Sequence, residues 1–585
     1  MKTSNVGKFV ALHAAAAFAL SLAMPGTANA GPKGTHFKAS GPDFTSGDNG
    51  DEIRTPLDFE KDAAINPVGP ASLSLFSRCR SLPGNMIGTY APIASPESNA
   101  IVGDTQFFFA DGTHCYNPQN ESNIVVNPVN AQNLVTSANE YRLDGHAVYY
   151  STNGGASWIN TVLPGWTAST GGRGQFSHLS SFGDPVLAFS PDGSRLYYAG
   201  LVGNGGKGGN QGLSGIAVAV STDGGANWGE PKMVSYAASN NIFNDKEWLA
   251  VAPNGTVYIT WTRFFSDARH GYRESPIVIS KSVDGGNSWS DFVKVSDAAH
   301  PYDQGSNPAV GPDGTLYVAY EGATPSSGYN QDALIVARST DGGATFTNTE
   351  VARVYDDLDC YPLQIGAQGR QTLSFEQFRN SNFPTIALDS TIGATGKIVI
   401  VWADNRNHPS CGNGGSAFNP ALGPTQNQVF MVTSSNGVNW SAPQGITTSD
   451  NYDKAYPSVA ADKGRIVVGY YTRAYSPIPT PGDLSCARQV FNSTTGSAVP
   501  YPGANSLKPV CLDYAARSSN DAFASEVRLT SQSSNPYVLF SGSFIGDYTG
   551  MAMDSNGKGI AVWADFRGNP TATTPNQDMV VRTGL

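Results

Sequence analysis

Charged residues are scarce in this chain, and basic residues are scarcer than acidic ones. Only 14% of the 585 residues are Asp, Glu, Lys or Arg, and 36 Lys and Arg against 47 Asp and Glu leave a formal net charge of −11. Without a basic stripe, the chain has no electrostatic footprint for nucleic acid or for an anionic membrane surface. The composition therefore predicts neither of these partners.

Motifs for cofactors and for common catalytic chemistry are also absent. The sequence has no Gly-x-Ser-x-Gly turn, no His-Glu-x-x-His, no phosphate-binding loop, no Cys-x-x-Cys and no EF-hand spacing. We therefore expect no cofactor and no metal. Calcium bound by loop carboxylates is the alternative to this expectation, although they do not have EF-hand spacing. Beyond the N-terminus no segment has a convincing helical period, and none has the length and apolarity of a transmembrane segment.

The first 30 residues have the pattern of an export signal. Lys2 and Lys8 precede an apolar run, Phe9 to Met24, and small residues up to Ala30 suit cleavage. We predict a signal peptide over 1–30, cleavage near Ala30, and a secreted or periplasmic mature chain. Residues 31–95 are polar and without periodicity, so we expect an extension or linker there and the main domain over 96–585.

Glycine is abundant, with 65 residues, and much of it lies in one repeated phrase. Four clear copies each end at an aromatic residue: Ser151-Thr-Asn-Gly-Gly-Ala-Ser-Trp158, Ser221-Thr-Asp-Gly-Gly-Ala-Asn-Trp228, Ser282-Val-Asp-Gly-Gly-Asn-Ser-Trp289 and Ser339-Thr-Asp-Gly-Gly-Ala-Thr-Phe346. A fifth, degenerate copy ends at Trp440. Each copy follows an apolar, alternating run, which is typical of a turn at the end of a strand. Asp and Ser can hydrogen-bond the turn backbone, glycine supplies positive φ, and the ring packs into the core.

A second repeated feature is an apolar hairpin that occurs seven times. The clearest copies are Pro185–Tyr198, Trp248–Trp261 and Pro308–Tyr320, and looser ones begin at Ile124, Pro384, Pro457 and Gly550. The repeat is long enough for four strands. We predict an all-β fold, a β-propeller of four-stranded blades, with seven blades favoured and six as the alternative. The repeated turn would join the third and fourth strands, C and D, counted from the axis. The last repeat lacks an outer strand, which we expect from Thr105–Phe109.

The repeated phrase resembles the Asp box, or BNR repeat, of sialidases and related β-propellers, over most of residues 120–585. The resemblance implies that Asp223, Asp284 and Asp341 are structural, because Asp boxes of this family lie away from the active site. It also implies a glycosidase in which three arginines hold the substrate carboxylate, a tyrosine activated by glutamate is the nucleophile, and an aspartate is the acid/base. The family's Phe/Tyr-Arg-Ile-Pro motif is absent, since Tyr141-Arg-Leu143 lacks the proline.

Strand direction predicts which residues share the face opposite the Asp boxes, because the ends of second strands and the starts of first strands both lie there. Second strands end in four arginines, which we expect to bind a substrate carboxylate: Arg263, Arg406, Arg473 and Arg567. Alternatively, each arginine stacks on a nearby ring or pairs with a neighbouring aspartate. First strands start with candidate catalytic residues: Asp184 or Asp245 as the acid, and Tyr548 or Tyr456 as the nucleophile.

Long connections also lie on this face, at about 356–383, 405–427 and 474–510. They hold four of the six cysteines, and an even number suits disulfides in an exported protein. We predict the pairs Cys360–Cys411 and Cys486–Cys511, which leaves Cys79–Cys115 in the N-terminal region.

Three functions fit this face. The first is an exported sialidase-like hydrolase of acidic glycans, with the substrate carboxylate held by the arginines. The second is a non-catalytic propeller that binds glycans or proteins, which the missing arginine motif favours. The third is a hydrolase or lyase of another acidic polysaccharide, for which His300 beside Tyr302 is the only suggestive pair. A carboxylate-bearing glycan is the expected partner.

Overall fold

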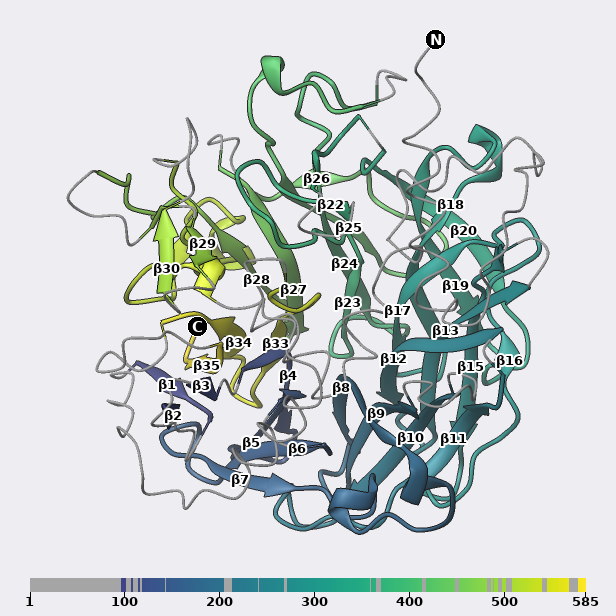
Figure 1. Cartoon of the computed structure of the whole chain (residues 1–585). Helices are drawn as coiled ribbons and strands as arrows, with labels where there is room; N and C mark the ends of the chain where they lie inside the picture. The colour runs from purple at the N-terminus through teal and green to yellow at the C-terminus, as the bar shows by residue number, and fades with distance from the viewer. Residues whose placement is uncertain are drawn as a thin grey trace.

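Seven antiparallel sheets stand in a ring around one axis (Figure 1). The computed structural model describes residues 96–585 except 102–106, 109–113, 116–117, 142–143, 205–212, 240, 268–270, 358, 365–369, 413–416, 448–451, 481–485, 488, 493–496, 501–507, 539–543 and 568–576. Apart from strands, the described residues form only short 3-10 helices. The chain is therefore a seven-bladed β-propeller, and the six-bladed alternative is wrong. The predicted signal peptide, the extension 31–95 and Cys79 lie outside the described residues.

Each blade has four strands, which follow the chain from the axis outward in the first six blades. Their bounds are β4 (Gln119–Asn127), β5 (Asn130–Glu140), β6 (Ala147–Ser151) and β7 (Ile159–Val162) in blade 1; β8 (Ser180–Phe189), β9 (Leu196–Asn204), β10 (Leu213–Ser221) and β11 (Lys232–Ala237) in blade 2; β12 (Ile242–Val251), β13 (Val257–Asp267), β15 (Ile277–Ser282) and β16 (Val293–Lys294) in blade 3; β17 (Asp303–Val310), β18 (Leu316–Ala323), β19 (Asp332–Ser339) and β20 (Thr347–Val354) in blade 4; β23 (Thr385–Asp389), β24 (Lys397–Asp404), β25 (Gln428–Ser434) and β26 (Gln444–Gly445) in blade 5; β27 (Lys454–Asp462), β28 (Arg465–Thr472), β31 (Asp513–Ser518) and β32 (Val527–Arg528) in blade 6; and β33 (Gly550–Met553), β34 (Gly559–Asp565), β35 (Asp578–Thr583) and β1 (Glu97–Asn99) in blade 7. Short additions are β14 (Gly271–Glu274) beside β13 and the hairpins β2 (Phe107–Phe108) with β3 (His114–Cys115), β21 (Leu363–Gln364) with β22 (Arg370–Gln371), and β29 (Gln489–Asn492) with β30 (Ser497–Pro500).

The ring closes through the N-terminal part of the chain. The first strands of successive blades pack side by side, from β4 through β33 and back to β4. As expected, a segment before blade 1 supplies the outer strand of blade 7. The segment is β1, however, in which Glu97 pairs with Arg582, so the prediction of Thr105–Phe109 is wrong. Because β1 is only three polar residues long, no hydrophobic alternation marks it. The backbone ladder to β35, side-chain contacts such as the Arg567–Glu97 pair at 2.7 Å, and buried Ile101 just beyond its end hold it in place.

The core consists of apolar clusters between neighbouring blades rather than one central mass. Val135 and Val148 of blade 1 pack with Leu187 and Tyr198 of blade 2, for example, in one buried cluster. Each fully buried side chain of this kind contributes roughly 1.5–3 kcal/mol relative to exposure. The apolar alternation of the hairpins therefore holds the ring together blade by blade.

The Asp-box turns join the third and fourth strands, as predicted. In blade 2, β10 ends at Ser221, whose Oγ accepts a hydrogen bond from the N–H of Gly225 at 3.0 Å. The carboxylate of Asp223 accepts from the N–H of Asn227 at 2.9 Å, and Gly225 has a φ of 100°. In the next blade, a Cβ added to Gly286 would lie 2.8 Å from a Val220 methyl carbon, so the turn packs tightly on the preceding blade. These aspartates act structurally, at the end of the propeller away from the starts of the first strands.

No helix among the described residues has the length and apolarity needed to cross a membrane.

Candidate functional site

Strained backbone marks the same position in most of the first strands. The pairing of β4, β8, β12, β17 and β27 with their second strands is interrupted by a bulge at residues 120–123, 183–186, 245–248, 304–307 and 455–458. Each bulge contains a residue of positive φ: Glu121 (56°), Asp184 (53°), Lys246 (51°), Gly305 (69°) and Tyr456 (48°). Non-glycine residues in this conformation cost of order 1–3 kcal/mol and cluster at functional sites.

Four charged side chains from different blades meet in one group: Glu121, Asp184, Lys246 and Asp547. We call these four residues, together with Arg379, the axial cluster. The Lys246 Nζ lies 2.5 Å from Oδ2 of Asp547, 3.5 Å from Oδ2 of Asp184 and 3.6 Å from Oε1 of Glu121. Arg379 pairs with Asp547 through two guanidinium nitrogens. All five side chains are buried. Carboxylates and cations that blades 1, 2, 3 and 7 provide therefore converge on the propeller axis.

The surroundings shift the pKa values of two carboxyl groups of the axial cluster in opposite directions. Burial raises the pKa of Glu121 well above its usual range, and the neighbouring Asp184 raises it further. Burial also acts to raise the pKa of Asp547, but Arg379 and Lys246 outweigh it and hold this pKa well below its ordinary value. The surroundings of Glu121 therefore favour its protonated form, while those of Asp547 favour its ionised form. Two neighbouring carboxyl groups whose pKa values are shifted in opposite directions are suited to general acid–base chemistry.

A small cavity opens beside the axial cluster. Its volume is about 40 Å³, and it is lined by residues of six blades: Asp184, Lys246, Glu247, Trp248, Gly305, Ser306, Asn307, Ser381, Phe383, Pro384, Thr385, Tyr456, Pro457, Asp547 and Tyr548. Three of the four catalytic candidates from the sequence, Asp184, Tyr456 and Tyr548, are among them. The fourth, Asp245, is buried next to Lys246 and accepts a hydrogen bond from Gln304 at 3.3 Å.

Both tyrosine hydroxyls of the cavity donate to backbone carbonyls. The Tyr548 hydroxyl donates to the carbonyl of Pro185 at 3.3 Å, and that of Tyr456 donates to the carbonyl of Arg379. Burial, with the nearby carboxyls of Glu121 and Asp184, raises the pKa of Tyr548 well above its usual value. This geometry keeps the phenolic protons in place.

The four predicted clamp arginines do not line the cavity. Arg406 and Arg567 each pair with an aspartate two residues earlier in the chain, at 2.6 and 2.7 Å, and Arg567 also reaches Glu97 of β1. Arg473 pairs with Asp453 and donates to the carbonyl of Ser374 at 2.6 Å, while Arg263 lies 4.8 Å above the ring of Phe292. Each arginine thus has an aspartate or an aromatic ring as a partner within the protein.

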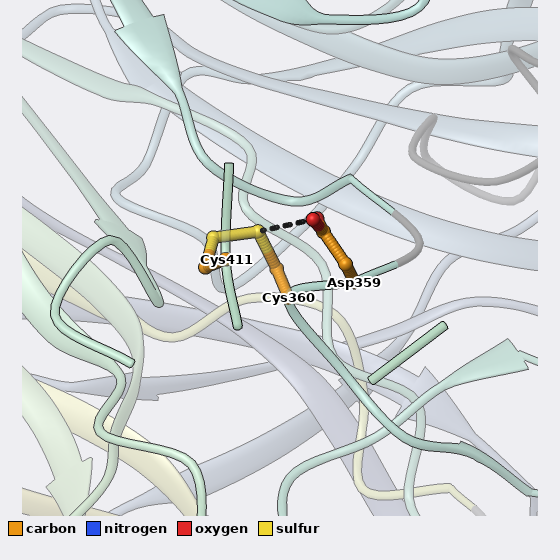
Figure 2. A group of neighbouring side chains, drawn as sticks. All are labelled: Asp359, Cys360 and Cys411. Atoms are coloured by element: carbon orange, nitrogen blue, oxygen red, sulfur yellow. Dashed lines mark hydrogen bonds between the residues drawn. A yellow bond between two sulfur atoms is a disulfide. The ribbon is translucent and has the colours of Figure 1, made fainter. Parts of the chain in front are cut away.

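Two disulfides secure the long loops on this face, and both predicted pairs are confirmed: Cys360–Cys411 and Cys486–Cys511. The first joins the loop that carries Arg379 to the loop after β24, and Asp359 lies beside it, with 3.8 Å between its Oδ1 and the Cys360 Sγ (Figure 2). Because both sulfurs are in the disulfide, no thiolate is left to bind a metal here. Two disulfides fit an oxidising compartment. Cys79 and the side chain of Cys115 lie outside the described residues.

Of the axial cluster, sequence reasoning identified only Asp184. Lys246 and Asp547 lie next to the predicted candidates Asp245 and Tyr548, whereas Arg379 and Glu121 have no such local signal. Arg379 lies in a long loop that starts at the end of blade 4, and only the fold carries it to Asp547 of blade 7. Glu121 occupies the same bulge position as Asp184 and Tyr456, but a serine follows it where proline follows the other two. Aligning the first strands by their bulges would have identified Glu121.

No protein-family model matches the chain. No curated protein matches it either. Among solved structures, the chain is similar to an alpha-L-arabinanase of Penicillium chrysogenum, with 14% identity and a TM-score of 0.39 over 60% of this chain and 88% of that one. It is also similar to the Hadza microbial sialidase Hz136, with 12% identity and a TM-score of 0.38 over 77% and 73%, and to the intramolecular trans-sialidase of Ruminococcus gnavus, with 10% and 0.35 over 68% and 93%. These likenesses are too distant to assign a family or a substrate to this chain.

Proposed function

We propose that this propeller is an exported glycoside hydrolase that acts on acidic glycans at the axial cavity. The observation that carries the proposal is the convergence of three buried carboxyl groups and two cations beside a cavity, on strained bulges of several blades. Buried charge and strain of this kind lower the stability of a fold, and they are concentrated at functional sites.

The size of the cavity favours recognition of a carboxylate. At about 40 Å³ the cavity has room for a small polar group. Lys246 lines the cavity and Arg379 lies behind Asp547, so both cations can attract a substrate carboxylate placed there. We assign carboxylate recognition to these two residues in place of Arg263, Arg406, Arg473 and Arg567, whose partners lie elsewhere.

Acid and base roles follow from the two kinds of carboxyl. Asp184 lines the cavity, and the neighbouring Glu121, whose pKa is raised, favours a proton there, so we assign Asp184 delivery of the proton to the leaving oxygen. Asp547 is ionised and also lines the cavity, but Lys246 and Arg379 would have to release its carboxylate before it could activate water or act as a nucleophile. Tyr548 and Tyr456 remain the nucleophiles predicted from the sequence, and each would first have to give up its backbone acceptor.

A second function, a binding propeller without turnover, has a specific observation in its favour. Both cations of the axial cluster already hold Asp547, and both tyrosine hydroxyls are held by backbone carbonyls. A site locked in this way could recognise an acidic group at the mouth and perform no chemistry.

A panel of fluorogenic glycosides tests the two functions against each other. We expect the purified mature protein to hydrolyse a carboxylated glycoside, such as a sialoside or a uronide, and Asp184→Asn to lower turnover by about 10²–10⁴-fold. Tyr548→Phe and Tyr456→Phe separate the nucleophiles, because only loss of the true nucleophile removes turnover while leaving the melting temperature and substrate binding intact. Saturable glycan binding without turnover on any member of the panel would favour the binding propeller.

A further inference from the structure

A separate group of three carboxylates lies in blade 4, away from the axial cluster. Glu321 is near the end of β18, Asp332 is the first residue of β19, and Asp356 follows the end of β20. Strand pairing brings these positions together, because Ala323 pairs with Asp332 and Asp332 pairs with Val354. All three side chains are buried, and one carboxylate oxygen of each lies within 4.8 Å of one of every other. Ser339 of the Asp-box turn ends β19 at the opposite end of the sheet.

No positively charged group of the described part of the chain compensates the carboxylates of Glu321 and Asp356, which lie close enough to each other to share a proton. Neither side chain is exposed at all, and none of their four oxygens accepts a hydrogen bond from a described donor group. Arg353, three residues before Asp356, is held by Asp357 instead. Buried carboxylates without a donor or a cation are strongly unfavourable, so this group either holds a proton, which burial and the neighbouring carboxyls favour by raising the pKa values of Glu321 and Asp356, or binds a cation.

We propose that Glu321, Asp332 and Asp356 bind a calcium ion. Ca²⁺ takes carboxylate and carbonyl oxygens at about 2.3–2.6 Å, so two oxygens on one ion are at most about 5 Å apart, which the three side chains satisfy. A dense, all-oxygen ligand set selects a hard cation, and transition metals favour the imidazole and thiolate ligands that are not part of this group. The sequence predicted no metal because the ligands come from three separate strand ends and form no local motif.

The position of the site gives the ion a structural task. Asp356 opens the loop that continues through Cys360 to Arg379, and Cys360 is tied to the next blade by its disulfide. An ion at Asp356 would fix the start of this loop on blade 4, while Asp547 fixes Arg379 on blade 7. The calcium site does not depend on whether the axial cavity is catalytic.

Calcium titration of chelator-treated full-length mature protein tests the proposal. We expect one Ca²⁺ per chain by isothermal titration calorimetry and a saturable rise of the melting temperature with CaCl₂. Glu321→Gln and Asp356→Asn should each weaken binding by at least about tenfold and reduce the rise. Mg²⁺ should bind more weakly, because it demands a tighter octahedral shell.

The matched control is Asp513→Asn. Asp513 is equally buried, but its carboxylate is satisfied by Arg528, Thr530 and Ser533, so this variant should lower the melting temperature and keep the full calcium response. The proposal is overturned if the wild type takes up no Ca²⁺. It is also overturned if Glu321→Gln and Asp356→Asn stabilise the protein equally with and without Ca²⁺, since protons rather than a metal would then occupy the group.

Discussion

The Lys246 ammonium is the group whose removal should destabilise the axial cluster most. It lies within 3.6 Å of three buried carboxylates, those of Asp547, Asp184 and Glu121, and is itself only 6% exposed. Lys246→Met keeps most of the side-chain length and removes the charge. Breaking a buried ion pair from one side costs about 3–5 kcal/mol. Arg379 still compensates Asp547, so we expect the lower end of this range, about 3 kcal/mol.

Equilibrium urea unfolding at pH 7 measures this loss directly. Lys294→Met is the control, because the Lys294 ammonium forms an exposed pair with Glu274 at 3.2 Å and exposed pairs contribute about 0–1 kcal/mol. Adding Asp184→Asn to Lys246→Met should recover part of the loss, with a coupling energy of about 0.5–3 kcal/mol. If Lys246→Met and Lys294→Met lower the unfolding free energy equally, the axial charges are not coupled in the way the distances imply.

Three further predictions concern other parts of the chain. Asp223→Ala removes the acceptor of the Asn227 N–H and should lower the unfolding free energy by about 1–2 kcal/mol without changing turnover; a loss of turnover at unchanged melting temperature would refute the structural role. Burial lowers the pKa of His146 to about 3. Below pH 6.5, His146 therefore binds a proton in the unfolded chain but stays neutral in the folded chain. Stability should therefore fall by about 1.4 kcal/mol per pH unit between roughly pH 6 and pH 3 on account of this residue, and His146→Gln should flatten the measured pH profile; parallel profiles would contradict this. Arg473→Lys should lower the melting temperature clearly, because lysine cannot reach both Asp453 and the Ser374 carbonyl; an unchanged melting temperature with lost glycan binding would restore Arg473 to the predicted clamp.

The repeats made the fold predictable, because each hairpin and each Asp-box turn carries its own local signal. The Ser221 turn, for instance, needs its serine, aspartate and glycines at fixed offsets, and the structure uses all of them. The closing strand could not be placed in the same way. Glu97-Ser-Asn99 has no alternation, and its pairing depends on where the last blade ends in space.

The site was predictable where it follows from strand direction. Asp184, Tyr456 and Tyr548 start first strands, and they do meet at one cavity. Strand direction alone could not tell how far from the axis a side chain lies. The strand-end arginines do not line the cavity and have other partners, as Arg406 does with Asp404. Arg379 reaches the axis through a long loop whose course the local sequence does not encode.

The most direct test of an acidic-glycan hydrolase at the axial cavity compares one glycoside with its own methyl ester. The two substrates differ only in the charge of the carboxyl group, so the ratio of their kcat/KM values isolates recognition by Lys246 and Arg379. We predict that the wild type strongly prefers the acid and that Lys246→Met narrows the ratio by tenfold or more, about 1.4 kcal/mol. Equal kcat/KM values for acid and ester in the wild type, or a ratio that Lys246→Met leaves unchanged, would contradict carboxylate recognition at this cavity.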